Sequence, residues 1–561
     1  MTFLPIAERE LRVASRKRGT YWGRLVPAAL ALIVWCGVEL LSSTAFVGMV
    51  GAGKFQFGVF MMLAFLYACA VGLFVTSDAL SEEKREGTLG LLFLTDLRGY
   101  DVIAGKLVSH SIPAFYGLIA AFPMMAIPLL SGGLTGGEFW RTMLMLANTM
   151  FLSLSAGLLV SSVSRNAMRA MNGTLLLLLG LIFGCPLVDL ALAGWNSTKS
   201  VAIFSLASPW YVLGNVNAYK LKDFWLSLGL EHVVAWSFLG LACLGVPRAW
   251  QEKSRSGAGP RKPALARWRY SSAAARRALL DRQPIFWLAA RDRSPGRLIW
   301  ALTILIAVAY YWSMAKFAEP MMAIFVFGPL MGVINFVLTV WMISQACRFF
   351  FDGRRNGALE LILVTPVTPE EIIAGQWTAL KRVIIGPTVA LTAVYMAGGL
   401  LESLAMNNPL ARAGVTNFGP AHIEVTNLIA GGITRIANLM AAGWFGMWLG
   451  LTERKAPTAI IKTFCYVIAI PALVIGFLRV APLFALLATS GRYAWWISTA
   501  IYVALTVAKD VGFIFVAKAN LSAHFRETVA LDGRRAVQFK PRMLATNLQP
   551  PPLPGQPPVI R

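Results

Sequence analysis

Long apolar runs set the first limit on what this chain can fold into. A transmembrane helix needs about 20 consecutive, mostly apolar residues. We identify six such runs in each half of the chain, at residues 25–49, 56–80, 107–130, 139–163, 171–194 and 225–247, and at residues 297–316, 321–346, 382–404, 424–451, 459–479 and 494–517. They lack the alternation that is typical of the roughly ten-residue strands of a membrane barrel. The sequence therefore predicts an all-α, polytopic membrane protein with about 12 transmembrane helices.

The charged residues indicate how these helices are oriented. They make up 14% of the 561 residues, and the net charge is +24; a soluble domain has about 25% charged residues. Lys and Arg gather at the N-terminus, at 81–106, beside Arg165 and at 248–283, whereas the loops at 50–55, 131–138 and 405–423 are nearly free of them. The positive-inside rule then places both termini in the cytoplasm, as in a multi-pass inner (plasma) membrane protein of bacterial type. This charge pattern is explained by the lipid bilayer as a partner, and we expect no binding of nucleic acid.

The runs and the charge together divide the chain into four parts. Residues 1–247 form a first six-span half and residues 284–517 a second. A basic linker rich in Gly, Pro, Ala and Ser, at 248–283, joins them. The tail at 518–561 is polar and ends in "QPPPLPGQPPVIR", a composition that favours an extended, disordered chain.

A repeated stretch relates the two halves. "REGTLGLLFLTDLRGYDVIAGK", at 85–106, aligns without a gap with "RNGALELILVTPVTPEEIIAGQ", at 355–376. Weaker matches occur in the same order on either side of it, including Ile6 with Ile285 and Gly157 with Gly446. An even number of spans separates equivalent points. The halves are therefore interpreted as parallel repeats, which are related by a pseudo-twofold axis along the membrane normal.

Local signals predict the shape of the repeated stretch. In the second copy, Thr368, Pro369 and Glu371 form a capping box, with Thr368 as N-cap. A helix should start there and run into the next span. Before it, "GALELILVT" predicts a short apolar helix that begins beside a glycine, and "GTLGLLFLT" is its counterpart in the first copy. A helix so short and so flanked by charge should lie at the cytoplasmic surface.

The repeated stretch resembles the signature of ABC type-2 transporter permeases. In that family, an acid-x-Gly-Thr-Leu-acid motif follows the second span, and a Thr-Pro corner and a terminal Gly-Lys complete it. The two copies keep different parts of this pattern. The first has Gly90 at the position of the second acid and Asp96 at that of the proline. The second keeps Glu360 and Pro366 but has Asn356, Ala358 and Gln376 at the positions of Glu86, Thr88 and Lys106.

The resemblance implies a membrane permease subunit of an ATP-driven transporter, and it favours export. Separate ABC ATPase subunits, in two copies, would bind ATP and Mg²⁺ and would move the coupling stretches at 81–106 and 351–376, which contain the repeat. The spans would then alternate between inward- and outward-open states. Residues 3–18 would form an elbow helix. The implied coupling residues are Arg85, Glu86, Gly87, Thr88, Leu89, Thr95, Asp96 and Lys106, and Arg355, Gly357, Leu359, Glu360, Thr365, Pro366, Glu370 and Glu371.

The chain itself offers no catalytic or cofactor motif. "GYDVIAGKL" has one residue too many between its glycines and Leu107 where a phosphate loop needs Ser or Thr. The His and Cys residues have no metal-ligand spacing. Ionisable residues within spans are functional candidates, and we single out Glu231 and Glu402 for a substrate path. Two alternatives remain: an ion-coupled secondary transporter with six plus six spans, and a membrane-embedded transferase. The sequence does not indicate which substrate is transported.

Overall fold

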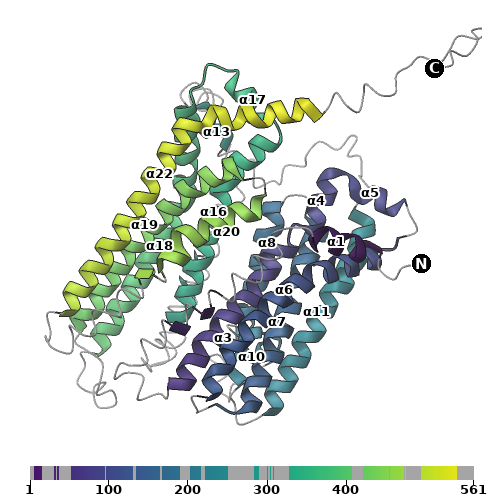
Figure 1. Ribbon diagram of the computed structural model, residues 1–561. Helices are drawn as coiled ribbons and strands as arrows, with labels where there is room; N and C mark the ends of the chain where they lie inside the picture. The colour runs from purple at the N-terminus through teal and green to yellow at the C-terminus, as the bar shows by residue number, and fades with distance from the viewer. Residues whose placement is uncertain are drawn as a thin grey trace, which may run out of the picture.

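The computed structural model describes, apart from isolated positions, residues 5–15, 52–94, 97–130, 134–164, 167–186, 203–216, 221–249, 283–289, 328–406, 421–453, 455–472 and 494–539. Within these ranges the regular structure is entirely helical, and the helices form two bundles that lie side by side (Figure 1). Six helical stretches there are long and apolar enough to cross a membrane: Gln56–Lys84, Gly99–Leu130, Gly136–Val163, Ala167–Gly184, Leu221–Pro247 and Thr499–Ala530. The predicted all-α, multi-pass membrane fold is confirmed.

The first bundle contains helices α3 (Ala52–Val71), α4 (Ala79–Glu86), α6 (Gly99–Leu130), α7 (Gly136–Val163), α8 (Ala167–Leu179) and α11 (Leu221–Ala249). Its core consists of large apolar side chains such as Phe57, Met145 and Phe224. The short helix α10 (Pro209–Asn215) closes the end opposite to α1 (Figure 1). Helix α7 also buries a row of small polar residues, of the kind that joins helices within a membrane.

The second bundle contains α16 (Gly328–Arg355), α18 (Pro369–Met406), α19 (Ala421–Thr452), α20 (Ala456–Phe464) and α22 (Ala494–Phe539). The two bundles meet where α8 packs against α16 and α20. Met168, Met171 and Leu175 share an apolar cluster with Val340 and Ile460. The contact between the two bundles is therefore mainly apolar and lies between α8 and helices α16 and α20.

The two bundles pack their second and fourth spans in the same register. A side chain added at Gly157 of α7 would lie against Thr76, and one added at Gly446 of α19 would lie against Ala346. Thr76 and Ala346 stand 270 residues apart, as do the two copies of the repeated stretch. The close approach of these helices therefore needs glycine at equivalent places in both halves.

Several predicted boundaries differ from the structure. Helix α6 begins at Gly99, eight residues before the predicted span at 107–130. Helix α18 begins at Pro369, as the capping box predicts, and runs into the predicted span at 382–404. The boundary placed at residue 518 is wrong, because α22 continues to Phe539. Its polar stretch stays helical because Leu521, Phe525 and Val529 recur every four residues and are buried against the second bundle. Predicted spans 25–49 and 297–316, the linker and the Pro-rich end lie largely or wholly outside the described residues.

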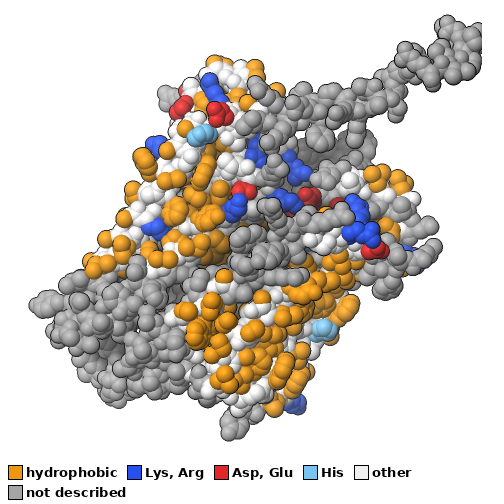
Figure 2. Space-filling view, in the orientation of Figure 1, with side chains coloured by type: hydrophobic (Ala, Val, Ile, Leu, Met, Phe, Trp, Pro, Cys, Tyr) orange, Lys and Arg blue, Asp and Glu red, His pale blue; other side chains and the backbone are white. Residues whose placement is uncertain are grey.

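Hydrophobic side chains cover the flanks of both bundles, and most of the visible charged residues lie toward the end that carries α1 (Pro5–Ser15) and α17 (Ala358–Leu363) (Figure 2). This distribution suits a bilayer around the flanks. The repeated stretches lie at that charged end (Figure 1).

Candidate functional site

Each copy of the repeated stretch folds as a helix, a left-handed glycine and a short helix. In the first unit, α4 ends at Gly87 and α5 (Thr88–Phe93) follows; in the second unit, α16 ends near Gly357 and α17 follows. The φ angles of Gly87 and Gly357 are 71° and 69°, and among the described residues no other glycine has a positive φ. A side chain is disfavoured in this conformation. The predicted short helices beside a glycine are confirmed.

One leucine anchors each short helix to its bundle. Leu89 and Leu359, at equivalent positions, are each 1% exposed. Leu89 belongs to a buried apolar cluster that also contains Leu239 and Val246 of α11. Leu359 belongs to an equivalent cluster that contains Leu521 and Phe525 of α22. Each short helix is therefore anchored in the apolar core of its own bundle, and α17 also contacts α22 directly.

The opposite side of each short helix is apolar and exposed. Leu91 is 63% exposed and Leu361, its equivalent, is 74% exposed; Leu94 and Val364 form a second exposed pair. Glu360 beside them is exposed as well. Exposed apolar side chains grouped on a charged end of a molecule are typical of a protein contact surface.

A basic residue in each unit caps the C-terminal end of the fourth span. Lys84 donates from Nζ to the carbonyl of Ser162 at the end of α7. Arg354, 270 residues later, donates to the carbonyls of Leu451 and Glu453 at the end of α19. The last carbonyls of a helix are unpaired and carry partial negative charge, so a cation stabilises them. Lys84 and Arg354 were missed by the sequence reasoning, although both are basic at equivalent repeat positions.

The helix that follows each unit starts at a polar cap. At α18 the backbone N–H of Thr368 donates to Glu371 Oε2 at 3.1 Å, and that of Glu371 donates to Thr368 Oγ1 at 3.3 Å. The predicted capping box is thus confirmed. At α6 only half of this arrangement exists, because the N–H of Arg98 donates to Asp101 Oδ2 at 2.9 Å.

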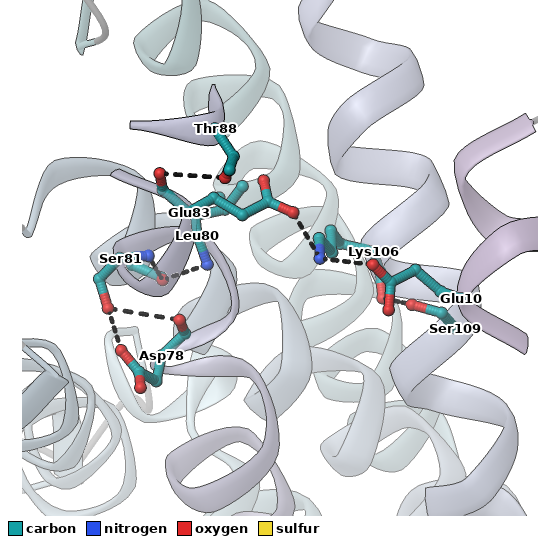
Figure 3. Close-up of polar contacts among 9 residues, drawn as sticks. Glu10, Asp78, Leu80, Ser81, Glu83, Thr88, Lys106 and Ser109 are labelled. Atoms are coloured by element: carbon teal, nitrogen blue, oxygen red, sulfur yellow. Dashed lines mark hydrogen bonds and ion pairs between the residues drawn. The ribbon is translucent and has the colours of Figure 1, made fainter. Parts of the chain in front are cut away.

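Lys106 lies inside the first unit rather than on its surface. Its side chain is 7% exposed, and its Nζ lies 2.7 Å from Glu83 Oε1 and 3.1 Å from Glu10 Oε1 (Figure 3). It therefore joins α6, which carries it, to α4 and to α1. Burial raises the pKa of Glu10, but the charge and the hydrogen bond of Lys106 outweigh burial, and the pKa of Glu10 lies below its usual value. The sequence placed Lys106 among the residues that contact a partner; in the structure its side chain links α6 to α1 and α4.

The first unit is also fastened to α7. The N–H groups of Leu80 and Ser81, at the start of α4, donate to Ser161 Oγ at 3.0 and 3.1 Å. The Ser81 hydroxyl bonds in turn to Asp78 (Figure 3). These bonds satisfy backbone donors that a helix start leaves unpaired.

The helix before the first span of each half docks on the third span in the same way. A side chain added at Gly105 would come within 2.8 Å of Ile6 Cβ, and one added at Gly375 would come within 2.8 Å of Ile285 Cβ. Helix α1 and helix α13 (Pro284–Ala289) therefore lie against equivalent glycines of α6 and α18. The first of these is the helix that the sequence predicted at residues 3–18.

The remaining predicted coupling residues that the structure describes are partly or fully exposed. Thr88 is partly exposed and donates to the carbonyl of Glu83 at 3.3 Å. In the second copy the following residues are exposed: Arg355, Thr365, Pro366, Glu370 and Glu371. Thr95 and Asp96, and the side chains of Arg85 and Glu86, lie outside the described residues.

Of the two residues predicted for a substrate path, the structure describes the side chain of one. Glu231 on α11 is buried and lies beside Thr149 and Asn148 of α7. The next residue, His232, pairs with Asn148 Oδ1 of α7 at 2.8 Å through Nδ1 and with Trp236 through Nε2. Glu231 thus lies in the interior of the first bundle. The side chain of Glu402 lies outside the described residues.

The comparison with known families agrees with this geometry. Residues 25–235, which include α3 to α8, the first unit and most of α11, match the sequence model of the ABC-2 family transporter protein. This part of the chain is similar to ABC-2 family transporter proteins. No curated protein matches the sequence. The match to the ABC-2 family supports a transport permease component rather than a catalytic subunit.

Proposed function

We propose that this chain is a complete permease of an ATP-driven exporter, with two six-span halves on which two separate ABC ATPase subunits dock. The observation that carries the proposal is the matched pair of units at one end of the bundles. Both units have the left-handed glycine, the buried leucine and the exposed apolar pair. One ATPase would contact Leu91 and Leu94, and the other would contact Leu361 and Val364. ATP and Mg²⁺ would be bound by these subunits.

The contacts within each half support a route for the movement. Leu89 shares a buried cluster with residues of α11, and Leu359 shares one with residues of α22, so a displaced short helix would move the core of its own bundle. The bundles touch through an apolar cluster at α8, α16 and α20. Apolar surfaces with few directional bonds can separate and close again, which alternating access requires. On this proposal, closure of the two ATPases changes the contact of Met168 and Met171 with the second half.

Orientation follows from the same proposal. Both units would face the cytoplasm of a bacterial-type inner membrane, where ATP is available. Lys and Arg gather at this end, and the positive-inside rule agrees with that direction. Both termini would be cytoplasmic.

Co-purification tests the proposal. The full chain, in lipid nanodiscs, is combined with the ABC ATPase encoded nearest to its gene, and the mass of the complex is measured. The proposal expects two ATPase subunits per chain and stimulated ATP hydrolysis. The variant that combines Glu86→Lys and Glu360→Lys should lose both. If that variant binds the ATPase and supports hydrolysis like the original chain, docking at these units is excluded.

A further inference from the structure

The ion cluster of Lys106 joins three separate segments of the first half. Lys106 belongs to α6, Glu83 to α4 and Glu10 to α1, and the two N–O distances are 2.7 and 3.1 Å (Figure 3). Lys106 is nearly enclosed. A buried cation that loses its partners is strongly destabilising, so Lys106 requires its two carboxylate partners.

The second half lacks all three charges. Its register is fixed by contacts that both halves share: Ile6 and Ile285 lie against equivalent glycines, and Lys84 and Arg354 cap equivalent carbonyls. In that register the positions of the ion cluster, in the order Glu10, Glu83 and Lys106, are occupied by Ala289, Gly353 and Gln376.

Other contacts hold the second half together at this place. A side chain added at Gly353 would lie 3.0 Å from Leu359 Cγ, so the short helix α17 packs directly where α4 carries Glu83. Arg382 of α18 lies over the ring of Phe286 in α13, with 5.9 Å between the guanidinium carbon and the ring centre. An exposed cation–π contact is weak compared with a buried, charge-assisted hydrogen bond, and this one joins two segments rather than three.

We propose that the two coupling units are mechanically unequal: Lys106 ties the first unit, α1 and α6 into one body, whereas the second unit is joined to α13 through apolar packing and moves more freely relative to it. This inference rests on the proposed function for its consequence. A force on α5 then moves the elbow helix α1 and helix α6 together, whereas a force on α17 displaces mainly α22. Lys106 is a positioning residue, since its side chain does not reach the exposed surface of α5.

Hydrogen exchange on the full chain in nanodiscs tests the tie without any ATPase. In Lys106→Gln, amide exchange should rise about tenfold or more in both α1 and α4, because the lost bonds are charge-assisted. Lys106→Arg should restore the original rates. Glu10→Gln should raise exchange in α1 alone, since Lys106 keeps Glu83. The matched change Gln376→Ala should leave exchange in α13 unchanged. Equal responses of α1 and α13 to the two matched changes would overturn the proposal.

A second arm tests the consequence. In the complex with the ATPase, Lys106→Gln should leave two ATPase subunits bound but reduce the stimulation of ATP hydrolysis several-fold, with rescue by Lys106→Arg; Gln376→Ala should do neither. If no ATPase binds the original chain, the proposed function is wrong. The hydrogen-exchange result then still shows whether Lys106 links α1, α4 and α6. If Lys106→Gln and Gln376→Ala reduce stimulation equally, the inequality of the two units is wrong.

Discussion

Gly87 and Gly357 stand 270 residues apart and have nearly the same left-handed backbone, with φ angles of 71° and 69°. Each turns the chain from a membrane-spanning helix into a short surface helix. The two turns indicate that both halves form the same unit of helix, glycine and short helix, because the conformation is set locally and needs no distant contact.

Alanine at either glycine should destabilise its unit. Nothing lies within 4 Å of an added Cβ at either position, so the cost comes from the backbone alone. A residue with a Cβ loses about 1–2 kcal/mol in the left-handed region. We expect Gly87→Ala and Gly357→Ala each to lower the thermal unfolding midpoint in detergent. Gly240→Ala is the control, because Gly240 is helical and equally open, and it should not lower the midpoint. An unchanged midpoint in both test variants would contradict the assigned turn.

Removal of the α18 cap should also be measurable. Thr368→Ala removes the acceptor for the N–H of Glu371 and should cost about 0.5–2 kcal/mol. Thr378→Ala is the control, since the Thr378 hydroxyl donates only to the carbonyl one turn earlier, that of Ala374, at 2.8 Å. The check is amide exchange in the first turn of α18, which should rise for Thr368→Ala only. Faster exchange in both variants would show that the cap is not the cause.

The cap of α19 should need the positive charge of Arg354. Arg354→Gln should destabilise the chain by about 1–2 kcal/mol, because the carbonyls of Leu451 and Glu453 lose a cation at a helix C-terminus. Lys518→Gln, at an exposed position of α22, should have no such effect. Thermal unfolding of both variants in the same detergent decides this, and equal midpoints would refute the cap.

Acid should weaken the attachment of α1. The folded-state pKa of Glu10 is below its usual value, so its ionised form favours the folded state above that value, and the contribution disappears as the pH falls through the folded pKa. Glu10→Gln should therefore lower the unfolding midpoint at pH 7, and the difference from the original chain should shrink near pH 3.5, below the usual Glu pKa of about 4.3. A difference that is the same at both pH values would exclude this ion pair as its source.

The sequence predicted those parts of the fold that depend on local patterns. Apolar runs of membrane length, the glycine before each short helix and the cap at Thr368 are all read from neighbouring residues. Helix α22 was predicted too short although its signal was present: Leu521, Phe525 and Val529 form an apolar stripe in a polar segment, and average polarity concealed it.

The ion cluster could not be predicted in the same way. Lys106, Glu83 and Glu10 come from three segments, and only the packing of α1 on α6 brings them together. The family resemblance placed Lys106 among the coupling residues and gave no sign of its partners. The contrast with Ala289, Gly353 and Gln376 becomes visible only after the structure supplies the register.

The most direct measurement for the central claim is the affinity of the ABC ATPase for the variant that combines Leu91→Glu and Leu361→Glu. Both leucines are exposed, so the substitutions should leave folding intact. Burial of one leucine is worth about 1.5–3 kcal/mol. Each single change should therefore weaken binding at one unit about tenfold or more, and the double variant should retain no measurable binding. Leu130→Glu, at the other end of α6 where Leu130 is 90% exposed, should bind normally. Unchanged affinity of the double variant would contradict the account.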